Sequence, residues 1–199
     1  MPDGHYFDAE PSVASRPGRV TLKLRDGTVE LATDRGVFAA GQADAGTVLL
    51  LEVAPPPPSS GDVLDLGCGY GAIAVTLARR APAATVWAVD VNRRALELTA
   101  ANAAQLGLAN VRTALPSDVP PSVRLAGIWS NPPIRIGKAA LHELLVTWLD
   151  RLLPSGRAWL VVQRHLGSDS LAGWLGSEGF TATRRASRRG YRVLEVGPG

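Results

Sequence analysis

The stretch VLDLGCGYGA, residues 63–72, constrains the fold more than any other part of this chain. An apolar run typical of a strand ends in it, three glycines follow, and a helical pattern then begins. Glycine permits positive φ and lets a ligand approach the backbone, and the first turn of the helix offers free N–H groups. The stretch therefore predicts a ligand-binding turn between a strand and a helix of an α/β sheet.

The pattern after this turn alternates between strands and helices with short connections. Expected strands cover 63–67, 85–90, 110–113, 125–130, 157–163, 180–187 and 191–196, and expected helices cover 72–81, 92–107, 138–153 and 171–179. The last two strands form a hairpin around Arg189-Gly190. This order predicts an α/β fold with a doubly wound, Rossmann-like sheet of seven strands and an antiparallel C-terminal edge hairpin.

An N-terminal extension precedes this pattern. Residues 19–33 have the alternation of two strands joined by Asp26-Gly27, a pair common in hairpin turns. A short helix is expected over 45–53, with Asp44 as its N-cap. The extension is too small to bury a core of its own, so we expect it to pack on the main sheet.

Length and composition predict one domain. The chain has 199 residues, a length ordinary for one domain, and 46% of them are hydrophobic, as in soluble globular proteins. We expect 1–199 to form a single domain in which 1–60 pack on a core of 61–199. No apolar run of about 18 residues predicts a membrane span, and the start does not resemble a signal peptide.

The chain has one cysteine, Cys68. It cannot form an internal disulfide, which suits the cytoplasm. No second cysteine or cluster of histidines accompanies it, so we expect no metal site.

Arginines gather near the C-terminus. The net charge of +3 alone barely favours a nucleic-acid partner. Between residues 181 and 199, however, Glu195 is the only acid, and the arginines are Arg184, Arg185, Arg188, Arg189 and Arg192. A solvated hairpin face and a phosphate-binding surface explain this cluster equally well. In the second case, affinity for RNA should fall with salt.

The glycine turn has two interpretations. The spacing G-x-G-x-x-A over 67–72, with Asp90 ending the next strand, fits a dinucleotide fingerprint. The spacing D-x-G-x-G-x-G over 65–71 instead matches the S-adenosylmethionine (SAM) loop of class I methyltransferases. Asp65 favours SAM, because a carboxylate there can hold a cationic amino-acid group but is awkward beside a pyrophosphate. In both interpretations Asp90 can accept hydrogen bonds from ribose hydroxyls.

A second chemical motif, Ser-Asn-Pro-Pro, ends the strand expected over 125–130. In a doubly wound sheet this strand lies beside the strand that carries the glycine turn, so Asn131 should face the same crevice. Its side-chain carbonyl and the Pro132 carbonyl can accept hydrogen bonds from an exocyclic amine, and Pro133 stiffens the turn. Two such acceptors orient the amine lone pair toward a methyl group and stabilise positive charge on the nitrogen.

DLGCGYG, VDVN and SNPPI together resemble the amino-methylating class I methyltransferases, and the wider pattern resembles the RsmC-type branch. Further marks of that branch are HYF near the start, DRGVF, DAGTVLL, VDVNRRAL, SNPPIRIGK, LH, VVQ and the basic hairpin. The likeness covers nearly the whole chain, although the family's enzymes often carry two related halves and this chain has one. The resemblance implies a SAM-dependent methyltransferase that modifies guanine N2 in 16S ribosomal RNA, alone or in the small ribosomal subunit.

The resemblance also implies roles for individual positions. The target-amine site would comprise Asn131, Pro132, Pro133 and Ile134, where Ile134 replaces the aromatic residue of many relatives. The cofactor would be held by Asp65, Gly67, Gly69, Gly71, Asp90, Val91, Asn92, Ser117, Asp118 and Asn131. Cys68, inside the glycine turn, is interpreted from the residues alone as a small side chain that fills space beside the cofactor. Candidate substrate contacts are Arg135, Lys138 and Phe38, with simple packing an equal alternative for Phe38.

Other functions remain open from the sequence. A protein glutamine, an adenine or a small-molecule amine could occupy the same acceptors. The dinucleotide spacing allows an NAD-dependent oxidoreductase, and a binding module could keep the fold without catalysis. The target nucleotide and the oligomeric state are not determined by the sequence.

Overall fold

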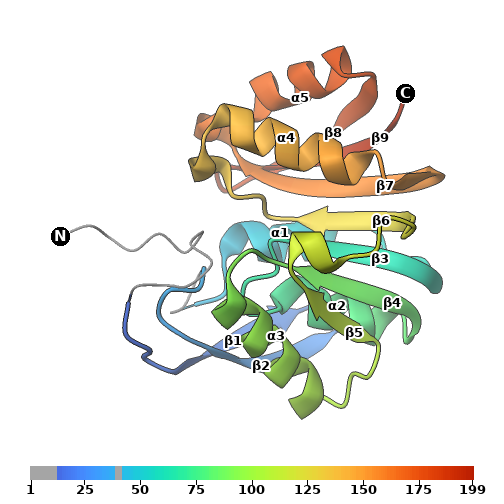
Figure 1. The fold of residues 1–199 in the computed structure, drawn as a ribbon. Coiled ribbons are helices and arrows are strands. Elements are labelled where there is room, and N and C mark those ends of the chain that lie inside the picture. Colours follow the sequence, from blue (N-terminus) through green and yellow to red (C-terminus); the bar gives the residue numbers. More distant parts are fainter. Residues whose placement is uncertain (1–12, 39–41) are drawn as a thin grey trace.

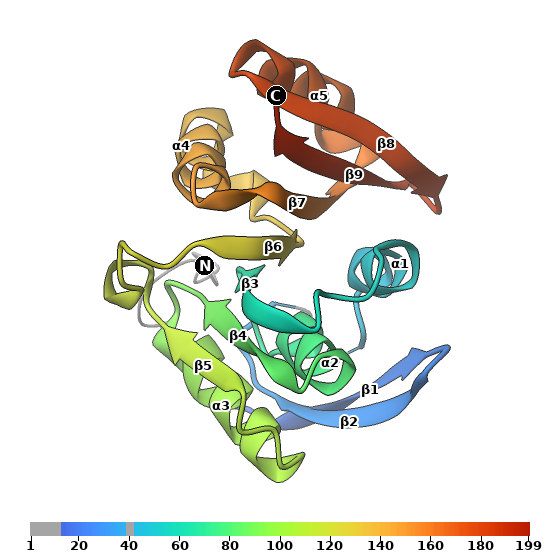
Figure 2. The ribbon, with the colours of Figure 1, turned by 90° about the vertical axis from the view of Figure 1, so that its right-hand side faces the viewer.

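The computed structural model describes residues 13–38 and 42–199, so the HYF motif at 5–7 lies outside the described residues. Its main sheet has seven strands in the order β5-β4-β3-β6-β7-β9-β8 (Figures 1 and 2). The strands are β3 (Ser60–Leu66), β4 (Ala83–Val89), β5 (Val111–Ala114), β6 (Leu125–Ser130), β7 (Leu152–Gln163), β8 (Phe180–Arg188) and β9 (Tyr191–Pro198). Strands β3 to β7 pair in parallel, and β9 pairs antiparallel with both β7 and β8. The predicted sheet and its antiparallel edge are thus confirmed.

Helices cover both faces of this sheet (Figure 1). One face carries α1 (Ala45–Val53), α2 (Ala72–Arg80) and α3 (Arg93–Gln105), and the other carries α4 (Lys138–Leu149) and α5 (Ser168–Ser177). Side chains alternate across a strand, so Val63 packs in the first layer and Leu64 in the second, both fully buried. Burial on both faces explains why the central strands have continuous apolar sequences.

The N-terminal hairpin forms a separate two-stranded sheet of β1 (Gly18–Leu24) and β2 (Gly27–Thr33). Leu24 pairs with Gly27, so Arg25-Asp26 forms the loop; the predicted Asp26-Gly27 turn was wrong by one residue, since Gly27 belongs to the ladder. The Asn102 side chain on α3 bonds both the N–H and the carbonyl of Ala32, at 2.8 and 2.9 Å. These bonds fasten the hairpin to α3, and the same buried side chain donates to the Tyr70 carbonyl in the glycine turn at 2.8 Å.

The helix predicted over 138–153 ends earlier than expected, at Leu149. Residues from Leu152 onward, including Pro154, belong to β7 instead. Leu152 pairs with Leu125, and the register then shifts, which is the kind of irregularity at which a strand tolerates proline.

The parallel strands end at one edge of the sheet. Leu66 of β3 pairs with Ser130 of β6, and the Ser130 hydroxyl donates to the Leu66 carbonyl at 2.7 Å. Gly67 and Asn131 therefore follow neighbouring strand ends, as predicted for strands that lie side by side. Within 13–38 and 42–199, none of the helices has both the length and the apolar character needed to cross a bilayer.

Candidate active site

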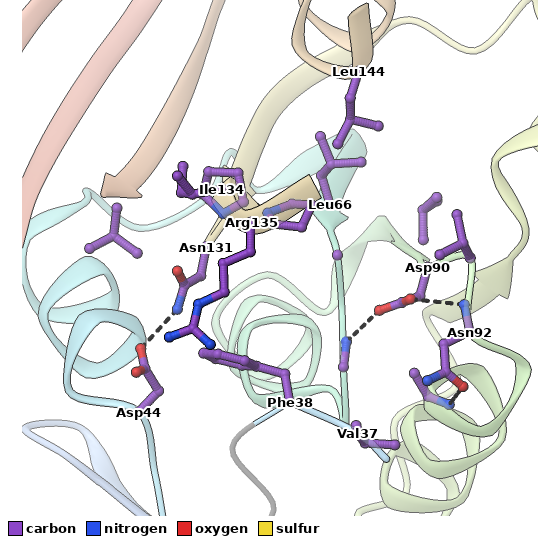
Figure 3. A pocket seen from close by; sticks show the side chains of 18 of the residues that line it. Val37, Phe38, Asp44, Leu66, Asp90, Asn92, Asn131, Ile134, Arg135 and Leu144 are labelled. Atoms are coloured by element: carbon purple, nitrogen blue, oxygen red, sulfur yellow. Dashed lines mark hydrogen bonds between the residues drawn. The ribbon is translucent and has the colours of Figure 1, made fainter. Parts of the chain in front are cut away.

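A cavity of about 310 Å³ opens at the carboxyl edge of the sheet. Its walls come from the glycine turn, the ends of β4 and β6, the start of β9 and the extension before α1, and Figure 3 shows most of these side chains. The volume lies at the lower end of the range usual for small-molecule sites, roughly 300–1,000 Å³. The position is where ligands of open α/β sheets bind.

The glycine turn gives the cavity one backbone wall. Gly67 and Gly69 line the cavity with φ of +77° and +57°. A Cβ added at Gly67 would meet nothing within 4 Å, so the backbone there borders open space. Gly71 has another role, because a Cβ there would approach Thr99 of α3 to 2.9 Å. The turn therefore leaves room for a ligand at its first two glycines and packs closely on α3 at its third.

Asp90 and Val91 form the wall after β4. The Asp90 carboxylate accepts the N–H groups of Gly69 at 2.9 Å and Asn92 at 3.0 Å. Burial raises the pKa of Asp90, and these N–H groups oppose the shift. Val91 is 41% exposed, and it lines the same cavity.

Asn92 connects this wall to the extension. Its side chain caps α3 and donates to the Gly36 carbonyl at 2.9 Å. Arg94, the second residue of α3, donates to the Arg35 carbonyl at 2.7 Å. These contacts hold the turn that brings Val37 and Phe38 to the cavity.

Asp65 and Cys68 do not line this cavity. The Asp65 side chain is fully buried, and its Oδ2 accepts the N–H of Ala74 at 2.8 Å. It thereby caps α2, whose N-cap residue Gly71 has no side chain. Among the described residues, its Oδ1 has no hydrogen-bond partner. Cys68 is also buried beside Thr99, and burial raises the pKa of its thiol.

We expect Asp65 to make stability fall as pH rises. Burial, with a smaller contribution from Asp90, raises the pKa of Asp65 to about 8, above the value of about 3.9 in an unfolded chain. The folded state therefore holds a proton that the unfolded state has released, and the stability this provides is lost between about pH 4 and 8. Asp65→Asn keeps an acceptor for Ala74, so its Tm should vary less over pH 5–8 than that of the wild type. Parallel Tm curves for the two proteins would contradict this expectation.

Asn131 lines the cavity and also a smaller pocket beside it, which Thr47 and Cys68 line as well. Its side-chain nitrogen donates to Oδ1 of Asp44 at 2.8 Å and to the Thr47 hydroxyl at 3.1 Å. Figure 3 shows the amide turned toward Asp44 at the start of α1. The side-chain oxygen of Asn131 is left as the end that can accept from a ligand.

The two prolines and Ile134 continue this wall. The Pro132 carbonyl accepts the N–H of Ile134 at 2.8 Å, and the Pro133 carbonyl accepts that of Ile136 at 3.1 Å. A carbonyl has two lone pairs, so Pro132 retains one for a ligand. Ile134 adds an apolar surface.

The remaining candidates divide between the cavity and its surroundings. Arg135 lines the cavity, whereas Lys138 is the exposed first residue of α4 and does not. Ser117 and Asp118 are also exposed, and only Pro116 of their short 3₁₀ turn reaches the cavity. Direct contact with a ligand in this cavity is thus open to Arg135, while the other three side chains lie outside its lining.

Three polar residues of the site were not predicted as such. Asp44 was expected only as an N-cap, a role that it has, since it accepts the N–H of Thr47 at 2.8 Å. It also lines the cavity, as do Gln163 and Tyr191. Asp44 stands 87 residues from Asn131 and 147 from Tyr191, so no local pattern reports their contact.

The C-terminal hairpin brings arginines to the same edge. Arg185 pairs with Glu195 at 2.5 Å, and Arg192 pairs with Asp169. Within the described part of the chain, no ion pair with an acid involves the other three, Arg184, Arg188 and Arg189. Arg188 pairs in register with Tyr191, so the hairpin tip stands at the rim of the cavity. Over residues 13–38 and 42–199, His, Cys, Asp and Glu side chains form no group suited to a metal ion.

Comparison with known proteins gives a family match. The family model described as "Methyltransferase small domain" matches residues 28–195. The uncharacterized protein YbxB of Bacillus subtilis is 37% identical over 195 residues, which cover 96% of this chain and 97% of that protein. The ribosomal RNA small subunit methyltransferase C of Stutzerimonas stutzeri is 34% identical, over 94% of this chain and 57% of that protein. The chain thus spans little more than half the length of that methyltransferase.

A solved structure has the same fold. The T. thermophilus 16S rRNA N2 G1207 methyltransferase (RsmC), in complex with AdoMet and guanosine, aligns with a TM-score of 0.75 and 24% identity. The alignment covers 95% of this chain and 52% of that one.

Proposed function

The chain belongs to the methyltransferase small domain family, and we propose on this premise that it methylates the exocyclic N2 amine of a guanine in small-subunit ribosomal RNA. It is a SAM-dependent methyltransferase of the RsmC type, and SAM is its cofactor. The dinucleotide interpretation of the glycine turn is therefore set aside. The identity of the substrate is inferred. It is supported by the similarity to ribosomal RNA small subunit methyltransferase C and by the hydrogen-bond acceptors at Asn131 and Pro132. We further propose that residues 1–199 work as one domain.

The residues at the cavity fit the cofactor. Open space beside Gly67 lets a ligand approach the backbone, and the Asp90 carboxylate faces the same space. We assign Gly67 and Gly69 to the amino-acid end, Asp90 to the ribose hydroxyls and Val91 to one face of the adenine. Asp65 and Gly71 do not contact the cofactor in this assignment; they hold the glycine turn and α2 in place. The bound cofactor would supply a methyl group carried on a positively charged sulfur.

Asn131 and Pro132 bind and orient the target amine. The Asn131 oxygen and the Pro132 carbonyl each accept one N–H of the amine, which directs the nitrogen lone pair away from them. As positive charge develops on nitrogen, both preformed dipoles stabilise it. The proton can leave after transfer, so no strong general base is needed.

The rest of the pocket suits a base on an RNA strand. Ile134 and Phe38 offer apolar contacts to a base, and Arg135 stands at the same wall. Arg188 and Arg189 at the rim can contact phosphates on either side of it. A paired guanine would have to leave its helix to enter the cavity. A ribosomal RNA substrate would place the reaction in the cytoplasm.

One observation carries the proposal. The amide nitrogen of Asn131 is held by Asp44 and Thr47, which leaves its oxygen as an acceptor beside the glycine turn. An acceptor in that place suits an amine, whereas a hydroxyl or carbon nucleophile gains less from it.

The test is to find where a labelled methyl group goes. Purified protein and labelled SAM are incubated with small ribosomal subunits, free 16S RNA, DNA and total protein, and the labelled RNA is digested to nucleosides. We expect the label in N2-methylguanosine. Label only in protein glutamine, in adenine or in a small molecule would replace the proposal with one of the alternatives.

A further inference from the structure

Asp44 joins three distant segments of the chain at the cavity. Its Oδ1 accepts the backbone N–H of Thr47 and the side-chain nitrogen of Asn131, both at 2.8 Å. The Tyr191 hydroxyl donates to its Oδ2 at 3.3 Å, and Gln163 donates to that hydroxyl at 3.2 Å. The extension, the turn after β6 and the start of β9 thus meet at one half-buried carboxylate, and Gln163 of β7 reaches it only through Tyr191.

This carboxylate determines which way the Asn131 amide points. A carboxylate only accepts hydrogen bonds, and a carboxamide has one donor end and one acceptor end. The donor end must therefore face Asp44, because the flipped amide would set its oxygen against a carboxylate oxygen. Thr47 offers a second acceptor to the same nitrogen at 3.1 Å.

The backbone of α1 is shaped to allow this arrangement. A Cβ added at Gly46 would lie 2.6 Å from Cε1 of Tyr191. Only glycine lets the Tyr191 ring lie so close to the first turn of α1, where its hydroxyl reaches Asp44. In the sequence Asp-Ala-Gly-Thr over 44–47, Asp44 caps α1, Gly46 lets the Tyr191 ring approach, and Asp44 and Thr47 both accept from the Asn131 amide.

We propose that Asp44 is a positioning residue that acts through Asn131, holding its carboxamide so that the oxygen is presented to the target amine. This inference rests on the role given to Asn131 under the proposed function. It makes the start of α1 part of the active site.

The informative substitution is Asp44→Asn. Asparagine caps helices as well as aspartate does, so α1 and the overall stability should be preserved. Its amide can donate as well as accept, so it no longer imposes one orientation on Asn131. We expect kcat to fall by about 10-fold to 100-fold, since small misplacements near reacting atoms have effects of this order. SAM affinity and Tm should stay close to wild type. Asp44→Ser, which also caps the helix but is too short to reach Asn131, provides a second variant with the same expectation.

A double-mutant cycle separates positioning from a merely structural role. If Asp44 acts through Asn131, then Asp44→Asn should change kcat by less than about 2-fold when Asn131 is already alanine. An equal loss in both backgrounds, or full activity of both Asp44 variants, would overturn the proposal.

A second measurement needs no substrate. The side-chain amide signals of Asn131 in ¹⁵N-labelled protein are identified by their loss in Asn131→Ala. They should shift in Asp44→Asn and stay in place in Asp150→Asn, which makes the same charge change at the far end of α4. Unshifted signals in Asp44→Asn would overturn the proposal. Absence of ribosomal RNA methylation by the wild type would instead refute the proposed function, and the amide signals would still decide the role of Asp44.

Discussion

Asn131→Ala should lower turnover by about 10²–10³-fold, the usual effect of losing one preorganised hydrogen-bonding group at a reacting centre. The substitution removes the acceptor and leaves the turn of Pro132 and Pro133 intact, since that turn is held by backbone bonds to Ile134 and Ile136. Single-turnover methylation of the RNA substrate measures the change. Calorimetry with S-adenosylhomocysteine should give an affinity close to that of the wild type.

Gln105→Ala is the matched control for this experiment. It also removes a carboxamide, but from the exposed last residue of α3. Its turnover should equal that of the wild type. Unaltered turnover in Asn131→Ala would contradict the role assigned to Asn131, and a large loss of cofactor affinity would move that role to the cofactor.

Asp90→Ala should weaken SAM binding by about 100-fold while the fold persists. A carboxylate that accepts from two ribose hydroxyls contributes on the order of 3 kcal/mol, and each 1.4 kcal/mol is tenfold in affinity. The same carboxylate holds Gly69 and Asn92 through their N–H groups, so its removal also loosens the glycine turn. Because burial raises the pKa of Asp90, its loss also relieves the folded chain of a poorly solvated charge.

Calorimetry with SAM, S-adenosylhomocysteine and NAD(H) measures this effect. Asp150→Ala, remote from the cavity, should bind SAM as the wild type does. If Asp90→Ala kept full affinity for SAM, the ribose assignment would be refuted. Binding of NAD(H) but not SAM by the wild type would be at odds with the cofactor of the family.

Much of the fold could be predicted because its signals are local. Each central strand is a short apolar run, the helices repeat with their own period, and caps such as Asn92 mark where they begin. The misplaced end of α4 has a non-local cause: Leu152 suits a helix by pattern, and only its pairing with Leu125 in the sheet places it in β7. Local propensity cannot anticipate such pairing.

The residues of the site likewise separate into those that local motifs predict and those that only long-range contacts bring together. Motifs beside the strand ends, at Gly67, Asp90 and Asn131, could be predicted to meet because parallel strands share one carboxyl edge. The partners that orient Asn131 could not, since Asp44, which bonds Asn131, lies 87 residues before it, and Tyr191, which bonds Asp44, lies 147 residues after Asp44. Ser117 and Asp118 show the converse, because their resemblance to a family pattern does not bring their side chains into the lining of the cavity.

The wall formed by Val37 and Phe38 bears on how small such an enzyme can be made. A fragment cut just before β3 would keep the glycine turn at 67–71 and the pair Pro132-Pro133, yet it would lose one wall of the cavity and Asp44, which orients Asn131. A shortened enzyme designed only from the glycine turn and the Asn-Pro-Pro motif would therefore have a cavity open on one side. Protein engineers should retain the segment before β3 that carries Val37, Phe38 and Asp44.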